Sequence, residues 1–376
     1  MQIYKAKARL GFFVNACPCL AHGTCASHNR DRIIVLTLGI SMSKPAIPSF
    51  YFPTTVLMID DNVEFLKSIA IGLPAEAATY NFFSDPQRAL QLINDKYQGN
   101  EIADGLVNLI DEEEFEHRTL DVNVRDIYRI MYNKARFQQI STVVVDYHMP
   151  GMDGIEFCKS IKNSNIQKIL LTSIVDESKA IEVLNEGLIH TFIRKQSPNV
   201  MQLMSQALTQ AQHRYFLNLS HIIQQVVTKS PEESALGDPS FIDLFHKIAQ
   251  NFKAVEYYLT EFLGSFVFLD ADGNHYGLFT RIKEQIDFYC ESKEADQAPT
   301  EIIEALRSGA QILCHHNENN LSLPDGRVWE QYLFEAQKIS GKSDYYCAYA
   351  PGMFDVRTRN VMSFNDYSSP VGALNE

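Results

Sequence analysis

The stretch VVVDYHMPGMDG (143–154) decides how the first half of this chain is interpreted. Three valines lead into one carboxylate, Asp146, and the chain then turns at Met149-Pro150-Gly151. A β-branched run of this kind is typical of a strand that is buried on both faces of a sheet. The acidic residue at its end needs a separate explanation, because an isolated carboxylate is costly to bury.

Similar apolar runs lie before and after this stretch, each followed by a segment with helical spacing. They are TVLMIDDN (55–62), ATYNFFSD (78–85), STVVVDYH (141–148), QKILLTS (167–173) and HTFIRK (190–195). Five strands that alternate with helices predict an α/β domain with a doubly wound parallel sheet. Residues 95–140 contain the acidic run DEEEFE and the helix-like DIYRIMYNKARFQQI. We interpret them as an insertion between the second helix and the third strand, of undetermined role.

Polar residues stand at the ends of four of these strands: Asp60 and Asp61, Asp146, Thr172 and Lys195. Sites in an open parallel sheet form at the carboxyl ends of its strands, so we expect these side chains to meet. Three carboxylates repel one another unless a hard cation such as Mg²⁺ lies among them. A carboxylate also serves as a nucleophile toward a phosphoryl group, whose oxygens Mg²⁺, a lysine and a hydroxyl neutralise.

MIDDN, VVVDYHMPGMDG, LLTS and FIRK, in this order, resemble the receiver domain of two-component response regulators over roughly residues 54–200. The resemblance implies a CheY-like, flavodoxin-like, five-stranded fold that takes a phosphoryl group from a sensor histidine kinase. It implies that Asp146 is the phosphoacceptor. Asp60, Asp61, Asp146 and the main-chain carbonyl of His148 are then the implied Mg²⁺ ligands.

The same resemblance implies that Thr172 is the switch hydroxyl, Phe192 is the switch aromatic residue and Lys195 is the phosphate-binding lysine. Two positions depart from the family. Phe192 replaces the common tyrosine, so its inward position would be wholly apolar, and Gln196 stands where the family usually has proline. The second departure leaves the shape of the last loop open, although it does not affect the lysine.

The region 201–235 is predicted to be a long helix followed by a linker. Seven apolar residues recur mainly at spacings of three and four: Met204, Leu208, Ala211, Tyr215, Leu219, Ile222 and Val226. Such a seam either pairs with a second copy of the chain, which favours a homodimer on phosphorylation, or packs on the next domain. The linker is placed in SPEESALGDPS (230–240).

Residues 236–376 are predicted to form an α+β output domain. We expect a helix pair in 238–264 and helices in 282–292, 299–309 and 328–339, with a strand in SDYYCAYAPG. FVFLDADGNHYG (266–277) superficially matches a phosphatase-type hydrolase and an EF-hand loop. An EF-hand needs Gly and Glu where His275 and Arg281 stand, so we interpret DADG as a hairpin turn. His315, His316 and Cys314 are interpreted as loop and core residues rather than a metal site, and Trp329 as a core residue.

Net charge is −13, and residues 205–376 carry 13 Lys+Arg against 23 Asp+Glu, which opposes binding to DNA. Cys158, Cys290, Cys314 and Cys347 show no paired spacing, which is typical of small core residues in a reducing cytoplasm. No apolar run is long enough to span a bilayer, so we expect a cytoplasmic protein without membrane contact.

The first 53 residues are predicted to be a disordered or non-native extension, with Met42 as a plausible start. Two alternatives remain for this segment: a zinc cluster and a secretory leader. The cluster would use the cysteines and histidines of ACPCLAHGTCASH (Cys17, Cys19, His22, Cys25 and His28).

We therefore expect a response regulator that relays its signal through dimer or protein contacts and is not an enzyme beyond assisting its own phosphorylation. The whole chain loosely resembles quorum-sensing-type response regulators with a non-DNA-binding output domain, on the basis of NEGLIHTFIRK (185–195) and the acidic second half. An enzymatic or nucleotide-binding output and a DNA-binding output are the alternatives. The sequence does not identify the output partner.

Overall fold

The computed structural model of the chain describes residues 45–96, 102, 105–112, 117–173, 177–227, 234–295, 299–315, 330–352 and 360–368. Lys44–Glu376 form one compact unit. The cysteines and histidines of residues 17–28, together with His316 and Trp329, lie outside the described residues. The interpretations given to them stay predictions.

The predicted parallel sheet is present and has the strand order β3-β2-β6-β7-β8. Its strands are β2 (Thr54–Ile59), β3 (Ala78–Phe83), β6 (Ile140–Asp146), β7 (Gln167–Thr172) and β8 (Thr191–Arg194). All neighbouring pairs are parallel, and every residue of β2, β6 and β7 is buried. Burial on both faces explains why the sequence of these strands is continuously apolar.

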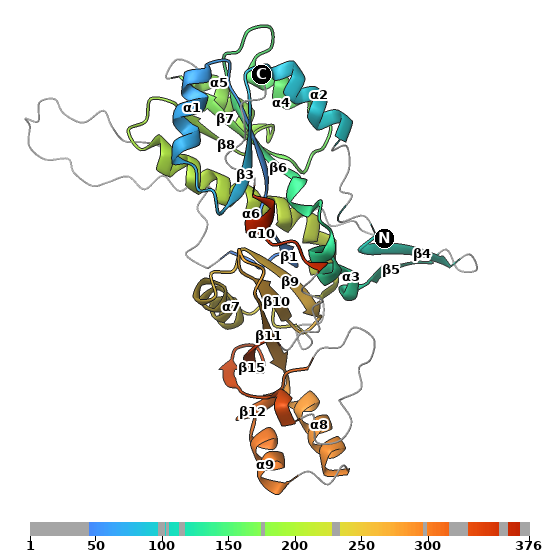
Figure 1. Cartoon of the computed structure of the whole chain (residues 1–376). Helices are drawn as coiled ribbons and strands as arrows, with labels where there is room; N and C mark the ends of the chain where they lie inside the picture. The colour runs from blue at the N-terminus through green and yellow to red at the C-terminus, as the bar shows by residue number, and fades with distance from the viewer. Residues whose placement is uncertain are drawn as a thin grey trace, which may run out of the picture. The chain divides into compact units, whose positions relative to one another are not determined.

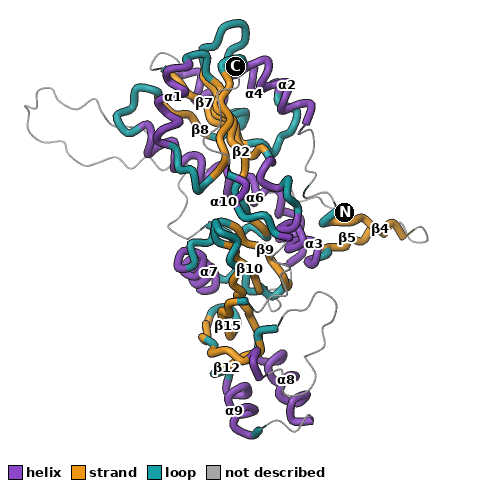
Figure 2. Tube along the Cα trace, in the orientation of Figure 1, coloured by secondary structure: helices purple, strands orange, loops and turns teal. Residues whose placement is uncertain are grey.

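Helices cover both faces of this sheet (Figures 1 and 2). On one face lie α1 (Val63–Gly72) and the first half of α6 (Val200–Val227). On the other lie α2 (Pro86–Lys96), α4 (Gly154–Ser160) and α5 (Glu177–Asn185). The doubly wound, flavodoxin-like fold expected from the sequence is therefore confirmed.

Two helix starts are fixed by side chains of the motifs that border the strand ends. The Asn62 side chain accepts a hydrogen bond from the Phe65 amide at 3.1 Å and caps α1. The Asp153 side chain accepts from the Glu156 amide at 2.7 Å and caps α4. Each cap satisfies an otherwise unpaired amide of the first turn, so both helices begin immediately after their sheet edge.

The insertion contains more strand than expected. It comprises β4 (Val107–Glu112), β5 (His117–Val122), α3 (Val124–Arg129) and two short 3₁₀ helices, η1 (Ile130–Tyr132) and η2 (Arg136–Gln138). β4 and β5 pair only with each other in an antiparallel ladder among the described residues. The single helix expected over 126–140 is thus divided into α3, η1 and η2.

The second domain is built on an antiparallel sheet of strand order β1-β9-β10-β11-β15-β14. The strands are β1 (Phe50–Tyr51), β9 (Glu256–Glu261), β10 (Ser265–Leu269), β11 (His275–Arg281), β15 (Asp344–Pro351) and β14 (Gln337–Ser340). A small sheet pairs β12 (Gln311–Leu313) with β13 (Leu333–Glu335). The helices are α7 (Pro239–Asn251), α8 (Lys283–Ala295), α9 (Thr300–Ser308) and α10 (Phe364–Tyr367).

The expected α+β mixture is present, with two local errors. The second helix expected within 238–264 is strand β9, and the helix expected over 328–339 contains strands β13 and β14. β9 is buried over nearly its whole length, so EYYLTE lacks the alternation that identifies a half-exposed strand. The hairpin at DADG, the strand in SDYYCAYAPG, and the helices α8 and α9 were predicted correctly.

The N-terminal extension is shorter than predicted. Phe50 and Tyr51 pair antiparallel with Tyr258 and Tyr257 of β9, and Phe50 and Phe52 are fully buried. Residues 45–53 thus belong to the fold, because apolar side chains that fill a core are ordered by that burial.

Most of the apolar seam of α6 is buried within its own chain. Met204, Leu208 and Ala211 pack on the parallel sheet, whereas Tyr215 belongs to the core of the second domain. Ile222 is 45 % exposed. The seam was predicted either to pair with a second copy of the chain or to pack on the next domain. Its buried residues are accounted for by packing within the chain.

Cys158, Cys290, Cys314 and Cys347 are all buried and free, as the sequence predicted. Within the described part of the chain, none of the helices is long and apolar enough to cross a membrane.

His213 on α6 makes stability depend on pH. Burial, together with the nearby His246, lowers the pKa of His213 to about 4. An unfolded histidine titrates near pH 6.5, so this contribution is present above that pH and is lost as the pH falls toward 4. We expect His213→Gln to reduce the decline in unfolding free energy between pH 7 and 5 by about 2 kcal/mol. Urea unfolding at both pH values measures this, with the exposed His221→Gln as control; an unchanged decline would contradict it.

Candidate functional site

Three carboxylates meet at the carboxyl edge of the parallel sheet. Asp60 follows β2 and Asp146 ends β6, the strand beside it, while Asp61 lies next in the chain. One oxygen from each side chain lies within 4.8 Å of the others. Asp60 and Asp146 are buried and Asp61 is exposed, so solvent reaches the cluster from one side.

Lys195 lies between the two buried carboxylates. Its Nζ is 2.7 Å from Asp60 Oδ2 and 2.8 Å from Asp146 Oδ2. Burial raises the pKa of Asp60, while Lys195 and the Asn62 amide act in the opposite direction. The Asn62 amide donates to Asp60 Oδ1 at 3.0 Å. Burial favours protonation of these carboxylates, and their charges repel one another. The positive charge of the lysine offsets both effects.

Phe65 is a part of this site that the motif comparison missed. The Lys195 ammonium lies 4.7 Å from the centroid of its ring, within the range of a cation–π contact. Phe65 occupies the first turn of α1, three residues after the Asn62 cap. Its position so soon after the acidic pair was the available signal, because a residue there must lie beside the strand ends.

Thr172 ends β7, next to the strand that carries Asp146. It is fully buried, and its Oγ1 has no hydrogen-bond partner among the described residues. A buried hydroxyl without a partner is costly, and a ligand oxygen at this edge would supply the missing bond. The orphaned hydroxyl fits a bound phosphoryl oxygen.

Phe192 and His148 are the remaining residues predicted for the site, and the switch role of Phe192 stays a prediction. Phe192 lies on β8 opposite Leu170, is half-buried, and packs on the core beneath α2, α4 and α5. The His148 ring makes an edge contact with Tyr147, at 4.6 Å between centroids. The metal-binding part given to its main-chain carbonyl stays a prediction.

Gly154 explains the sharp turn after Asp146. A Cβ at this position would lie 2.3 Å from the main-chain oxygen of Asp146 and 2.8 Å from Leu170 Cδ1. The Gly154 amide donates to the Tyr147 carbonyl at 2.9 Å, so the start of α4 is held directly beneath the loop. Only glycine permits so close an approach between α4 and the end of β6.

The donor set fits Mg²⁺. Hard oxygen ligands from one or two carboxylates, completed by water and phosphate, are what this ion requires. Asp60, Asp61 and Asp146 offer that set at one sheet edge, and the orphaned Thr172 hydroxyl lies on the neighbouring strand.

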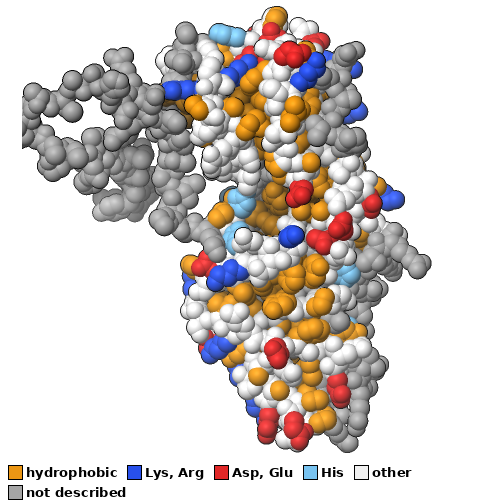
Figure 3. Space-filling model, turned by 60° about the vertical axis from the view of Figure 1, so that its left-hand side comes forward, with side chains coloured by type: hydrophobic (Ala, Val, Ile, Leu, Met, Phe, Trp, Pro, Cys, Tyr) orange, Lys and Arg blue, Asp and Glu red, His pale blue; other side chains and the backbone are white. Residues whose placement is uncertain are grey.

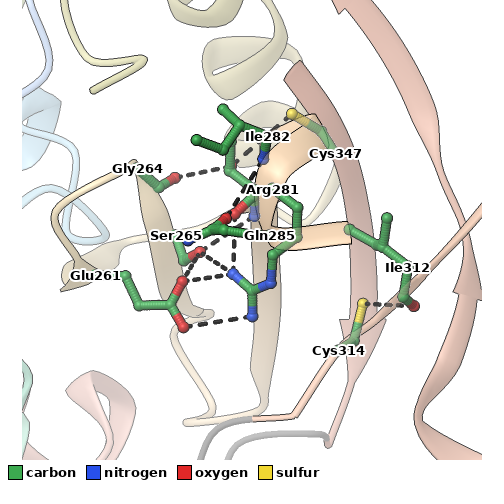
Figure 4. A network of polar contacts seen from close by, with 10 residues as sticks. Glu261, Gly264, Ser265, Arg281, Ile282, Gln285, Ile312, Cys314 and Cys347 are labelled. Atoms are coloured by element: carbon green, nitrogen blue, oxygen red, sulfur yellow. Dashed lines mark hydrogen bonds and ion pairs between the residues drawn. The ribbon is translucent and has the colours of Figure 1, made fainter. Parts of the chain in front are cut away.

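An ion pair between the buried Arg281 and the partly exposed Glu261 in the second domain has a structural explanation (Figure 4). Arg281 Nη1 contacts Glu261 Oε2 at 2.5 Å and donates to the Thr280 carbonyl at 2.9 Å. Burial raises the pKa of the nearby Cys314 thiol to about 12, so the thiolate needed for catalysis or metal binding is disfavoured. The ion pair thus links β9 to β11 across the intervening strand β10.

The DADG segment is a turn, as predicted. Asp270 Oδ1 accepts hydrogen bonds from the amides of Asp272 and Asn274 at 3.0 and 2.9 Å. A carboxylate that closes its own turn in this way is a local structural device.

On the face shown in Figure 3, Lys and Arg side chains are scattered and do not form the basic stripe that nucleic-acid binding requires.

Comparison with known proteins agrees with this geometry. A family model described as the response regulator receiver domain matches residues 100–208. The structure of the response regulator LqsR from Legionella pneumophila is similar with a TM-score of 0.70 and 32 % identity, over 85 % of this chain and 95 % of that one. The chain therefore belongs to the response regulators, with a receiver domain of the two-component type.

A second relative matches a shorter part of the chain. The hydrogenase transcriptional regulatory protein HoxA of Cupriavidus necator is 29 % identical over 114 residues, which is 30 % of this chain. The match spans only 22 % of HoxA. The family match to residues 100–208 contains Asp146, Thr172 and Lys195, but it begins after Asp60 and Asp61. The long insertion separates the acidic pair from the rest of the motif set.

Removing the lysine should strengthen Mg²⁺ binding. Lys195 already neutralises Asp60 and Asp146, so a divalent cation must compete with it. We expect Lys195→Met to bind Mg²⁺ roughly three- to tenfold more tightly at pH 8. The gain should shrink toward pH 5, because Asp60 loses the partner that opposes its protonation. Isothermal titration calorimetry measures this, with Lys179→Met on α5 as the control. Weaker binding at pH 8 would contradict the assignment.

Proposed function

We propose that this chain accepts a phosphoryl group on Asp146 from a sensor histidine kinase and relays the signal through changed protein contacts. The main support is the placement of Lys195 between Asp60 and Asp146, beside the orphaned Thr172 hydroxyl. In the transfer, the P–N bond of the phosphohistidine breaks and a P–O bond to the Asp146 carboxylate forms.

Asp60, Asp61, Asp146 and the His148 carbonyl would hold Mg²⁺. When bound, the ion supplies positive charge to the transferring phosphoryl oxygens. Lys195 supplies a further positive charge and is 2.8 Å from the acceptor carboxylate. Thr172 donates its hydroxyl hydrogen to a phosphoryl oxygen, which satisfies a group that is otherwise buried without a partner.

The response follows from movement at the same edge. As Thr172 shifts toward the phosphoryl group, space opens for the half-buried Phe192 to pack inward, and the face of α5, β8 and α6 changes shape. The two forms must differ in affinity for a partner, because otherwise phosphorylation shifts no equilibrium. A second copy of the chain is the partner we propose for this face, and the α6 seam residues buried within the chain are not available to it.

The second domain is proposed to act through protein contacts rather than on DNA. Its acidic charge, with 13 Lys+Arg against 23 Asp+Glu in residues 205–376, supports this choice. The likeness to the response regulator LqsR over most of both chains supports a response-regulator role for the whole chain. A mobility-shift assay that detects sequence-specific DNA binding would overturn this assignment.

Asp146→Asn should abolish phosphorylation. The amide is nearly isosteric with the carboxylate but lacks the nucleophilic charge, so label from a phospho-kinase should fall to background. Asp153→Asn is the matched control, because Asn caps α4 as well as Asp does and the residue lies outside the carboxylate cluster. The measurement is ³²P transfer from the cognate kinase, followed by gel autoradiography. Persistent labelling of the Asp146→Asn variant would sink the assignment.

Phosphorylation should change the oligomeric state. We expect beryllium fluoride with Mg²⁺, which mimics the aspartyl phosphate, to shift the protein toward a species of twice the mass. Size-exclusion chromatography with light scattering measures the mass directly. Asp146→Asn should remain unshifted under the same conditions. An unchanged mass for the wild type would argue against a phosphorylation-dependent dimer.

A further inference from the structure

A fully buried ion pair joins the insertion of the receiver to the sheet of the second domain. Arg136 lies in η2, just before the central strand β6, and Glu256 begins β9. Arg136 Nε donates to Glu256 Oε2 at 2.8 Å, and Nη2 donates to Oε1 at 2.9 Å. Both side chains are 0 % exposed. The bidentate geometry fixes the orientation of the two groups as well as their distance.

The remaining polar atoms around this pair are also satisfied. The Tyr258 hydroxyl donates to Glu256 Oε2 at 2.5 Å, and Arg136 Nη2 donates to the Met362 carbonyl at 2.6 Å. The guanidinium lies 4.0 Å from the centroid of the Phe137 ring. The cluster therefore binds three segments: the insertion, β9 and the stretch before α10. A buried pair of this completeness is costly to break, because separation leaves an uncompensated charge.

A second connection runs through β1 and α6. Gln212 of α6 is buried; its Oε1 accepts from the Tyr51 hydroxyl at 3.2 Å, and its Nε2 donates to Thr54 Oγ1 at 3.2 Å. Tyr51 belongs to the second sheet and Thr54 begins β2 of the receiver, so one side chain holds both. The Phe216 ring packs edge-on against Phe52, with 4.7 Å between centroids.

From these contacts we propose that Arg136 and Glu256 lock the receiver and the second sheet into one cooperatively folding body. The insertion thereby has a function, since it carries both Arg136 and α3, which packs along β9. The lock rests on the contacts alone. Its consequence for signalling rests on the proposed phosphorylation. A ligand at the Asp146 site then also stabilises the second domain against opening, while the two domains stay in contact.

Amide hydrogen exchange of the whole chain tests the lock. We compare the slowest amides of β6 with those of β9, without ligand and with beryllium fluoride and Mg²⁺. Segments that open in one cooperative event share one opening free energy, and a ligand that stabilises this event slows both equally. In the wild type we expect equal opening of both strands and the same slowing factor in both.

The variant Arg136→Met with Glu256→Gln breaks the lock without leaving a buried charge, and the Gln side chain still accepts from Tyr258. We expect β9 to open about tenfold or more faster than β6 in this variant. Beryllium fluoride should then slow β6 alone. The control, Arg281→Met with Glu261→Gln, removes a partly buried pair that lies wholly within the second sheet. It should leave the ligand response shared between both domains.

The outcomes separate the lock from the phosphorylation site. Independent opening of β6 and β9 in the wild type would overturn the lock, as would shared opening in the Arg136→Met, Glu256→Gln variant. Loss of the shared response in the control would also overturn it, because any weakening of the second sheet would then suffice. If β6 ignores beryllium fluoride while both strands still open together, the lock stands and the phosphorylation site fails.

Discussion

The receiver depends on one electrostatic constraint, which is the mutual repulsion of carboxylates gathered at a single sheet edge. Parallel strands bring Asp60 and Asp146 together whether or not this is favourable, and burial raises the pKa of Asp60. Lys195, delivered by another strand, relieves the repulsion from 2.7 and 2.8 Å. The site therefore requires positive charge. Lys195 supplies one such charge, and three carboxylates can bind more than one.

The parts of the receiver that follow from local pattern were predictable. A strand buried on both faces must be a continuous apolar run, and its polar ends must cluster, so β2, β6 and β7 and the residues after them could be located from the sequence. Phe65 was missed because its value comes from a contact with Lys195, 130 residues away in the chain. No local periodicity distinguishes a phenylalanine that meets a lysine from one that fills a core.

The second domain was harder because its elements are defined by distant partners. β9 was mistaken for a helix: buried on both faces, EYYLTE carries no alternation, and its neighbours β1 and β10 decide its conformation. The same holds for residues 45–53, which joined the fold only because Phe50 and Phe52 have a core to enter. Sequence pattern indicated the apolar seam of α6 but not which surfaces would cover it.

The junction between the domains combines apolar rings with a fixed set of polar contacts, and this combination has a physical reason. Phe50, Phe52 and Phe216 are fully buried and pack against one another, but apolar contact tolerates sliding and rotation. A bidentate guanidinium–carboxylate pair tolerates neither, because a small displacement leaves both charges buried and unpaired. Arg136 and Glu256 therefore add orientation to an interface that hydrophobic burial already favours. An output domain held in one orientation can respond to small changes at the far end of β6, whereas a loosely tethered one would average them out.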